Sequence, residues 1–305
     1  MQPIKNILVV IDPTVERDFV VERAKMIARA TAAKVLLFIN SSNTLNEHSY
    51  LYEGIDGDFF KAQSKFFETR YRKILDGLVE EFTEENIEVS SLYTEHHHLA
   101  ESIIGQAIES SPDLVLKSTH HHSAIGRALV TNTDWRLIRK CPPPLLLVKP
   151  NPWKTEGSIV AAVDPFHSKA DQSHLSHSLI SHAELLSSLL QQATSIFHSF
   201  FPFVSTMFPM GSESYLGLER MRDEHAKKLN ELLQDHNIAE GSIELSAGEI
   251  VPNLIKHLKT VNANMLIIGA LSRNVIERAI VGNTAEKILE GCPCDVLVMK
   301  PPQDN

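Results

Sequence analysis

Apolar residues recur along the chain in two alternating patterns: short continuous runs and longer stripes with helical spacing. The runs predict strands buried on both faces, and the stripes predict helices with one buried face. In the helix expected over 14–33, Val20, Ala24, Ile27 and Ala28 share one face. The expected strands are 7–11, 35–39, 87–93, 114–117 and 145–149 in the first half, and 159–163, 195–200, 242–245, 265–268 and 296–300 in the second. Such alternation predicts an α/β chain with two tandem doubly wound, five-stranded parallel sheets.

The two halves of the chain repeat each other. Cys141-Pro142 matches Cys292-Pro293 at a spacing of 151 residues (292 − 141). Near the start of each half, the run Ile7–Pro13 matches Ile159–Pro165 at a spacing of 152 residues (159 − 7). Agreement at both ends of so long a unit predicts a tandem duplication, with one domain over 1–150 and a second over 151–305.

The composition excludes several classes of protein. The formal net charge of −9 repels a phosphate backbone, so we expect no nucleic-acid partner. Apolar runs fall short of the roughly 18 residues that a membrane span needs, and the first residues carry no signal-peptide pattern. The 3 cysteines fit no disulfide framework. We therefore expect a cytoplasmic protein without a membrane partner.

The loop between Gly269 and Glu286 follows the fourth strand of the second half and leads into a helix near Ala285. A strand end, glycines at both ends of a loop and a helix N-terminus together form a geometry that binds phosphate. The alternative is a plain strand-to-helix connection, in which the glycines serve only for turning. The sequence leaves both interpretations open.

The strand-ending aspartates, the long second helix and the spacing from Gly269 to Gly282-Asn283 resemble universal stress proteins of the UspA superfamily. The resemblance covers essentially the whole chain and is closest to the tandem, UspE-like form. It implies the Usp fold, which is similar to that of adenine nucleotide alpha hydrolases, and a non-catalytic role in the stress response. It also implies ATP binding in members that have Gly-x-x-Gly, nine residues, and Gly-Ser/Thr after the fourth strand.

Carried over to the second half, the resemblance implies a nucleotide site at the end of the fourth strand. Phosphates would lie against Gly269, Ser272, Gly282, Asn283 and Thr284 next to Ile268, with Asp164 and Ser199 toward the nucleoside. Ser272 replaces the second glycine of the pattern, and its Cβ narrows the approach of a phosphate. In the first half Ser118, His121 and Thr131 stand at the glycine positions, so we expect ATP only in the second domain.

Within this family the fifth strands of two domains often pair. The resemblance therefore implies that the apolar strands 145–148 and 296–299 pair within the chain. An exposed apolar edge strand promotes association unless it is covered, which leaves a homodimer open as well.

Two histidine triplets, 96–98 and 120–122, follow the third and fourth strands of the first half. Imidazole is a common zinc ligand, so His97, His98, His120 and His122 are candidate ligands of a zinc sensor. The alternative is that they are exposed loop residues, because the third and fourth strands need not be neighbours.

Other interpretations also remain open. The aromatic segment 197–215 suits either a lid over an apolar ligand or side chains that fill the place of a nucleotide base. Cys292 and Cys294 are spaced too closely for Cys-x-x-Cys redox chemistry and are expected to be structural. A slow ATPase would need an activated water, for which no residue is evident.

Overall fold

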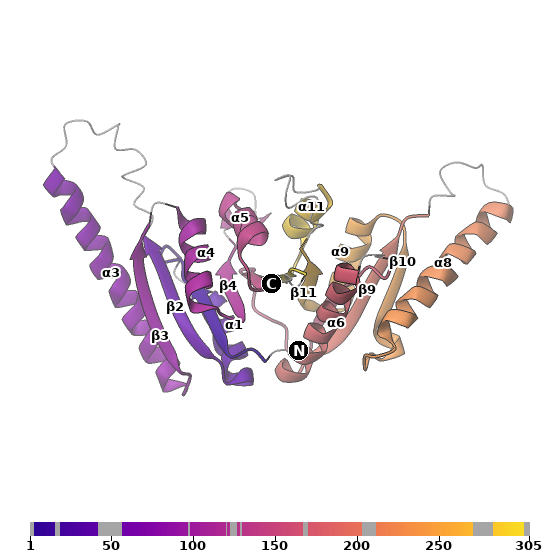
Figure 1. Ribbon diagram of the computed structural model, residues 1–305, viewed down its shortest axis with the longest axis horizontal. Coiled ribbons are helices and arrows are strands. Elements are labelled where there is room, and N and C mark those ends of the chain that lie inside the picture. Colours follow the sequence, from indigo (N-terminus) through magenta and orange to yellow (C-terminus); the bar gives the residue numbers. More distant parts are fainter. Residues whose placement is uncertain are drawn as a thin grey trace. The chain divides into compact units, whose positions relative to one another are not determined.

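A computed structural model describes residues 3–15, 19–41, 57–96, 98–119, 121–122, 127–128, 130–166, 170–202, 212–270 and 283–301. Contacts between Cα atoms divide the chain into two compact units, Gln2–Pro150 and Asn151–Asn305. Both units have the α/β architecture that the sequence predicts (Figure 1).

The first unit contains a parallel sheet with the strand order β3-β2-β1-β4-β7. Its elements are β1 (Asn6–Val10), α1 (Phe19–Thr31), β2 (Lys34–Ser41), α3 (Gly57–Glu84), β3 (Val89–Glu95), α4 (Leu99–Ser110), β4 (Leu114–Ser118), β5 (His121–His122), β6 (Arg127–Ala128), α5 (Asn132–Lys140) and β7 (Leu145–Val148). The two-residue strands β5 and β6 form a small antiparallel pair that the sequence does not predict.

The second unit repeats this arrangement with the order β10-β9-β8-β11-β12. Its elements are β8 (Ser158–Ala162), α6 (Ala170–Leu190), β9 (Ala193–Phe200), α8 (Ser212–Leu233), η2 (Glu240–Ser242), β10 (Ile243–Ala247), α9 (Ile250–Thr260), β11 (Ala263–Gly269), α11 (Asn283–Gly291) and β12 (Asp295–Met299). The doubly wound fold predicted for both halves is therefore confirmed.

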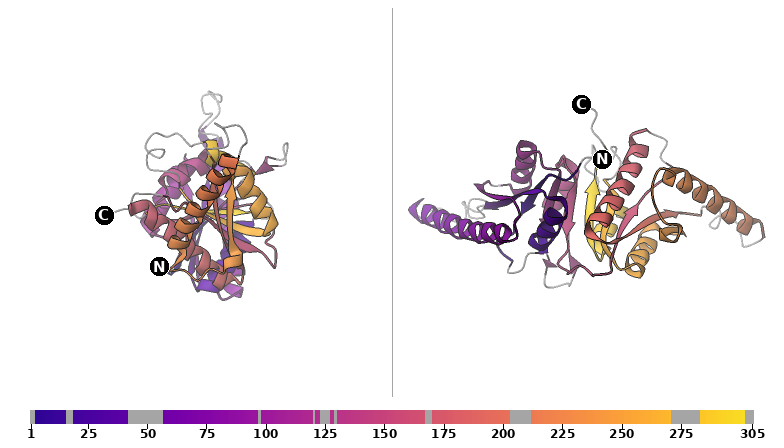
Figure 2. Two further views of the ribbon diagram at one scale, coloured as in Figure 1. Left: turned by 90° about the vertical axis from the view of Figure 1, so that its right-hand side faces the viewer. Right: turned by 90° about the horizontal axis from the view of Figure 1, so that it is seen from below.

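Burial on both faces explains why the central strands are continuous apolar runs. Right-handed crossovers place α1 and α3 on one face of the first sheet and α4 and α5 on the other, where these two helices pack together (Figure 2). The predicted stripe of α1 is buried, as the exposed fractions of 0–2% for Val20, Ala24, Ile27 and Ala28 show.

The first helix begins later than its apolar pattern suggests. Asp12 Oδ1 accepts hydrogen bonds from Thr14 N (2.9 Å) and Thr14 Oγ1 (2.6 Å), which stabilises a turn directly after β1. An aspartate that bonds the backbone two residues on competes with helix formation. Helix α1 accordingly begins at Phe19 instead of Thr14.

The segment that precedes β8 is anchored to its own unit. Trp153 Nε1 donates to Asp295 Oδ2 (2.7 Å), and the buried Asn264 side chain bonds both backbone groups of Lys154 (2.8 and 2.7 Å). Gly157 lies so close to Asn264 that a Cβ would be 2.0 Å from Nδ2. Only glycine fits beside this buried amide.

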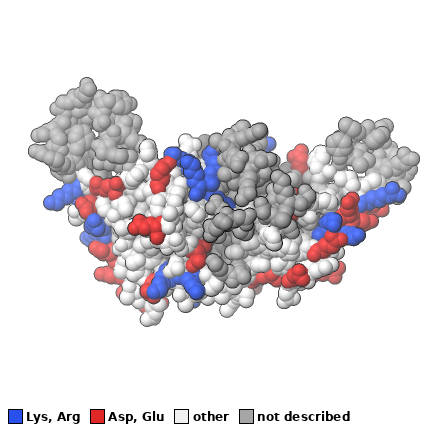
Figure 3. Space-filling view, viewed as in Figure 1, with Lys and Arg blue, Asp and Glu red and all other residues white. Residues whose placement is uncertain are grey.

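Charged side chains of both signs are interspersed on the face that Figure 3 shows. On that face the Lys and Arg residues do not gather into one continuous patch. No helix in the described part of the chain is long and apolar enough to cross a membrane.

Candidate functional site

In each unit the strand order reverses at the carboxyl ends of the strands, and we call this place the crevice of that unit. In the first unit β1 has β2 on one side and β4 on the other, and in the second unit β8 lies between β9 and β11 in the same way. Doubly wound sheets bind their ligands at this point. Asp12 and Asp164, which follow β1 and β8, lie at the two crevices.

The first crevice contains a cavity of about 280 Å³. It is lined by residues that follow β1, β2 and β4 and by side chains of two helices: Val10, Ile11, Asp12, Pro13, Thr14, Asn40, Ser41, Tyr71, Leu99, Lys117 and Ser118. Binding sites of small molecules commonly measure about 300–1,000 Å³, so this cavity suits a small ligand. The sequence predicted the ligand site in the other half.

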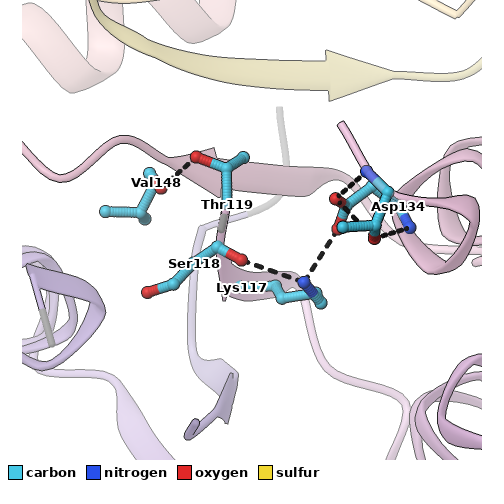
Figure 4. A network of polar contacts seen from close by, with 6 residues as sticks. Lys117, Ser118, Thr119, Asp134 and Val148 are labelled. Atoms are coloured by element: carbon cyan, nitrogen blue, oxygen red, sulfur yellow. Dashed lines mark hydrogen bonds and ion pairs between the residues drawn. The ribbon is translucent and has the colours of Figure 1, made fainter. Parts of the chain in front are cut away.

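Lys117, which lines this cavity, belongs to a buried ion pair (Figure 4). Lys117 Nζ lies 2.8 Å from Asp134 Oδ1 and donates to Ser118 O at 2.9 Å. The two side chains are only 4% and 0% exposed. Side chains of opposite charge that are buried this deeply require a partner, and here each is the partner of the other.

Asp134 also caps helix α5. Its Oδ2 accepts from Thr131 N (2.8 Å) and Thr131 Oγ1 (2.9 Å), while Asp134 N donates to Thr131 Oγ1 (3.2 Å), which makes a capping box. The positive end of the helix dipole attracts an anion to this place. In the first unit the chain's own carboxylate occupies the helix terminus at which a phosphate would bind.

The side wall of the first crevice is fixed by Asn40 and by two tyrosines. Asn40 Oδ1 accepts from the hydroxyls of Thr94 (3.0 Å) and Ser102 (3.1 Å), and its Nδ2 donates to His96 O (3.0 Å). Burial, together with the nearby Asp12 carboxylate, raises the pKa of Tyr71, so its phenol stays protonated. Burial and a hydrogen bond to Glu95 raise the pKa of Tyr93 to about 12. Of these groups, Asn40 and Tyr71 line the cavity and present amide and hydroxyl dipoles to it.

The second crevice differs because aromatic side chains gather beside Asp164. Phe166 N donates to Asp164 Oδ1 (3.0 Å), and the Phe166 ring lies 4.2 Å from the ring of His225. His198 Nε2 and His225 Nδ1 are 2.8 Å apart. Ser199, expected toward the nucleoside, donates to Gly248 O at 3.4 Å.

Gly269 and Ile268 lie at the end of β11, next to helix α6. A Cβ on Gly269 would be 2.7 Å from Leu175 Cδ2, so close packing of the helix accounts for this glycine without a ligand. Asn283 and Thr284 begin helix α11, whereas Ser272 and Gly282 lie outside the described residues. The nucleotide site in this half remains a prediction.

The strand order separates the two histidine triplets, since β2 and β1 lie between β3 and β4. Strands spaced about 4.8 Å apart put the two strand ends roughly 14 Å from each other. His98, which precedes α4, donates its N–H to His96 Nδ1 at 3.1 Å. His97 and His120 lie outside the described residues, and of His122 only the backbone in β5 is described.

No group of three or more His, Cys, Asp or Glu among the described residues is arranged to hold a metal ion. The three cysteines are buried and form no disulfide, and Cys292 Sγ lies 3.5 Å from Cys294 Sγ. The structural role expected for them agrees with this burial.

Sequence reasoning missed the two groupings that distinguish the crevices. Lys117 and Asp134 lie on a strand and a helix separated by a loop, and His198 and His225 lie on a strand and the following helix. A lysine at the end of an apolar strand was the one available signal for the first grouping, because such a position is buried and requires an acidic partner.

Comparisons with known proteins agree with this architecture. The sequence profile of the Universal stress protein family matches residues 3–149 and 159–300. The chain is 27% identical to Universal stress protein E of Photorhabdus laumondii over 305 residues, covering 97% of this chain and 95% of the relative. It is 26% identical to Universal stress protein E of Escherichia coli K12 over 312 residues, covering 98% and 95%. The crystal structure of a functionally unknown Pseudomonas aeruginosa protein shares the fold, with a TM-score of 0.77, 23% identity and coverage of 98% and 93%.

Proposed function

Because the chain belongs to the universal stress protein family, in a tandem form similar to Universal stress protein E, we propose that it acts in the stress response as a binding protein without catalytic turnover. In this proposal the first crevice binds a small, unphosphorylated polar molecule of the nucleoside class. The observation that carries the proposal is the cavity of about 280 Å³, whose lining lysine, Lys117, is already paired with Asp134.

Electrostatics favour a ligand without phosphate groups. The Lys117 ammonium would be the natural partner of a phosphate, but it is paired with Asp134 at 2.8 Å. A phosphate would have to displace a buried carboxylate that also caps α5, which leaves that carboxylate without its cation. The hydroxyls of Thr14, Ser41 and Tyr71 suit a neutral ligand with several donors and acceptors.

The lining residues also favour binding over catalysis. The described lining contains neither histidine nor cysteine, and its lysine is held as an ion pair. General acid–base catalysis at neutral pH needs a group that titrates near that pH. The raised pKa of Tyr71 makes it a hydrogen-bond donor and a poor base.

Isothermal titration of the full chain with adenosine and with ATP tests this proposal. Adenosine should bind, and Asp12→Asn should weaken its binding about tenfold because a charge-assisted hydrogen bond becomes a neutral one. Asp164→Asn is the matched control at the second crevice and should leave adenosine binding unchanged. ATP that binds more tightly than adenosine, with a loss in Asp12→Asn, would overturn the proposal. ATP binding lost only in Asp164→Asn would instead support the nucleotide site predicted for the second domain.

A further inference from the structure

The carboxyl ends of β8 and β9 carry a cluster of stacked rings around His225 of helix α8. The His225 ring lies 4.2 Å from the Phe166 ring and 4.5 Å from the Phe200 ring, measured between centroids. The planes of His225 and Phe200 differ by only 18°. The Phe200 ring therefore stacks on a face of the imidazole, whereas the Phe166 ring contacts it at a tilt of 44°.

The edge of the His225 ring is bound as well. His198 Nδ1 lies 3.0 Å from Val163 O, and a carbonyl only accepts, so this nitrogen carries the proton. Burial lowers the pKa of His198, which keeps the ring neutral, so its Nε2 is an acceptor. His225 Nδ1 therefore donates to His198 Nε2 at 2.8 Å. The imidazole of His225 thus contacts two phenyl rings and donates a hydrogen bond from its edge to His198.

The first unit has hydroxyl side chains at the positions that Phe166 and Phe200 take in the second unit. Val10 pairs with Phe38 in β1 and β2, and Ala162 pairs with Phe197 in β8 and β9, so Ser41 corresponds to Phe200. By the spacing of 152 residues, Thr14 corresponds to Phe166 (166 − 14). Thr14 and Ser41 line the open cavity of the first crevice. The second crevice thus has aromatic side chains in the same place, and His225 contacts both of them.

We propose that Phe166, Phe200 and His198 form a ring slot for a planar heterocycle with an N–H donor, and that His225 is an internal ligand that closes it. Phe200 and His198 are buried, each 4% exposed, whereas Phe166 is 40% exposed and opens the slot toward solvent. A ligand ring therefore has a route to the site once His225 leaves it. Asp164, beside the cluster, favours a ligand that carries donors or positive charge.

Removing the imidazole tests the ring slot in the full chain. His225→Ala should bind free imidazole, which should raise the melting temperature of the variant saturably and leave the wild type unchanged. N-methylimidazole has no N–H to give to His198 Nε2, so it should bind about tenfold more weakly. A cavity that keeps its walls and its acceptor accepts the fragment that was removed.

His257→Ala is the matched control, because the His257 ring also makes a side-chain hydrogen bond, here with the Ser195 hydroxyl (2.9 Å). Its one phenyl contact among the described residues is more distant, with Phe197 at 5.6 Å between centroids. This control should gain no imidazole binding. If His225→Ala does not fold, imidazole present during refolding should restore the folded chain. Absence of any imidazole effect on His225→Ala, or an equal effect on His257→Ala, would overturn the ring slot. Equal binding of both probes would overturn the role of His198.

Discussion

The buried pair of Lys117 and Asp134 makes a prediction for which the second half supplies the reference. At the matching positions, 151 residues further on, that half has Ile268 and Ala285. Replacing Lys117 with Ile leaves the Asp134 carboxylate buried without its cation. Replacing Asp134 with Ala leaves the Lys117 ammonium buried without its anion. Each single change should cost about 3–5 kcal/mol, and the loss of the α5 cap adds about 1 kcal/mol for Asp134→Ala.

The double variant should be more stable than either single variant. In the double variant no buried charge lacks a partner. Its free energy of unfolding should therefore be lower than that of the wild type by only about 1–2 kcal/mol, through the lost helix cap and imperfect packing. Urea unfolding followed by tryptophan fluorescence measures this cycle. The chain has 2 tryptophans, and Trp153→Phe in all four proteins leaves Trp135, next to Asp134, as reporter of the first unit. Single costs below about 1 kcal/mol that simply add in the double variant would refute the ion pair as a buried unit.

Two further predictions concern stability. Gly157→Ala should lower the free energy of unfolding by about 2–4 kcal/mol, because the new Cβ displaces the buried Asn264 amide and breaks its hydrogen bonds to Lys154. Gly105→Ala, with open space around it, should instead stabilise α4 by up to about 1 kcal/mol. Thermal unfolding of both variants measures the difference, and equal effects would contradict the prediction. Burial lowers the pKa of five histidines of the second unit, namely His177, His182, His198, His225 and His257. The unfolded chain takes up protons on these histidines below about pH 6.5, whereas the buried imidazoles of the folded chain stay neutral to lower pH. The free energy of unfolding should therefore be highest above about pH 6.5 and fall on acidification. The fall should be at most about 1.4 kcal/mol per pH unit for each histidine, and less for the more exposed ones. Unfolding between pH 7.5 and 5.5 with Trp153 as reporter measures the slope, and stability that rises on acidification would contradict the burial argument.

The sequence predicted those features that depend on local pattern. Continuous apolar runs such as Leu114–Leu116 are strands because both of their faces are covered, and the repeat made one half a guide to the other. The aspartates after β1 and β8 could be placed at strand ends because the apolar runs end directly before them. The cavity of the first unit was not predictable, because it depends on side chains from separate elements. His225, on a helix, shows no signal of its contact with Phe200, since the two meet only after α8 packs on the sheet.

Glycines were also ambiguous in the sequence. Gly269 matches a phosphate-binding pattern, yet a Cβ there would also meet the methyl group of Leu175 at 2.7 Å. Close packing and close approach of a ligand both select glycine, so a single glycine does not distinguish them. The capping box of α5 was not predicted for a related reason. Thr131 stands at a glycine position of the phosphate-binding pattern, so the sequence indicated only that this glycine is missing.

The Lys117–Asp134 pair also constrains the history of the duplicated chain. If both halves descend from one ancestral unit, at least one of them has passed between the charged pair and the apolar pair. Either order of single replacements passes through a protein with one unpartnered buried charge, at a cost that consumes much of the about 5–15 kcal/mol by which domains are stable. The intermediate with one replacement folds only if the unit is more stable than this cost. In a tandem protein the cost affects one unit, while the other keeps its stability.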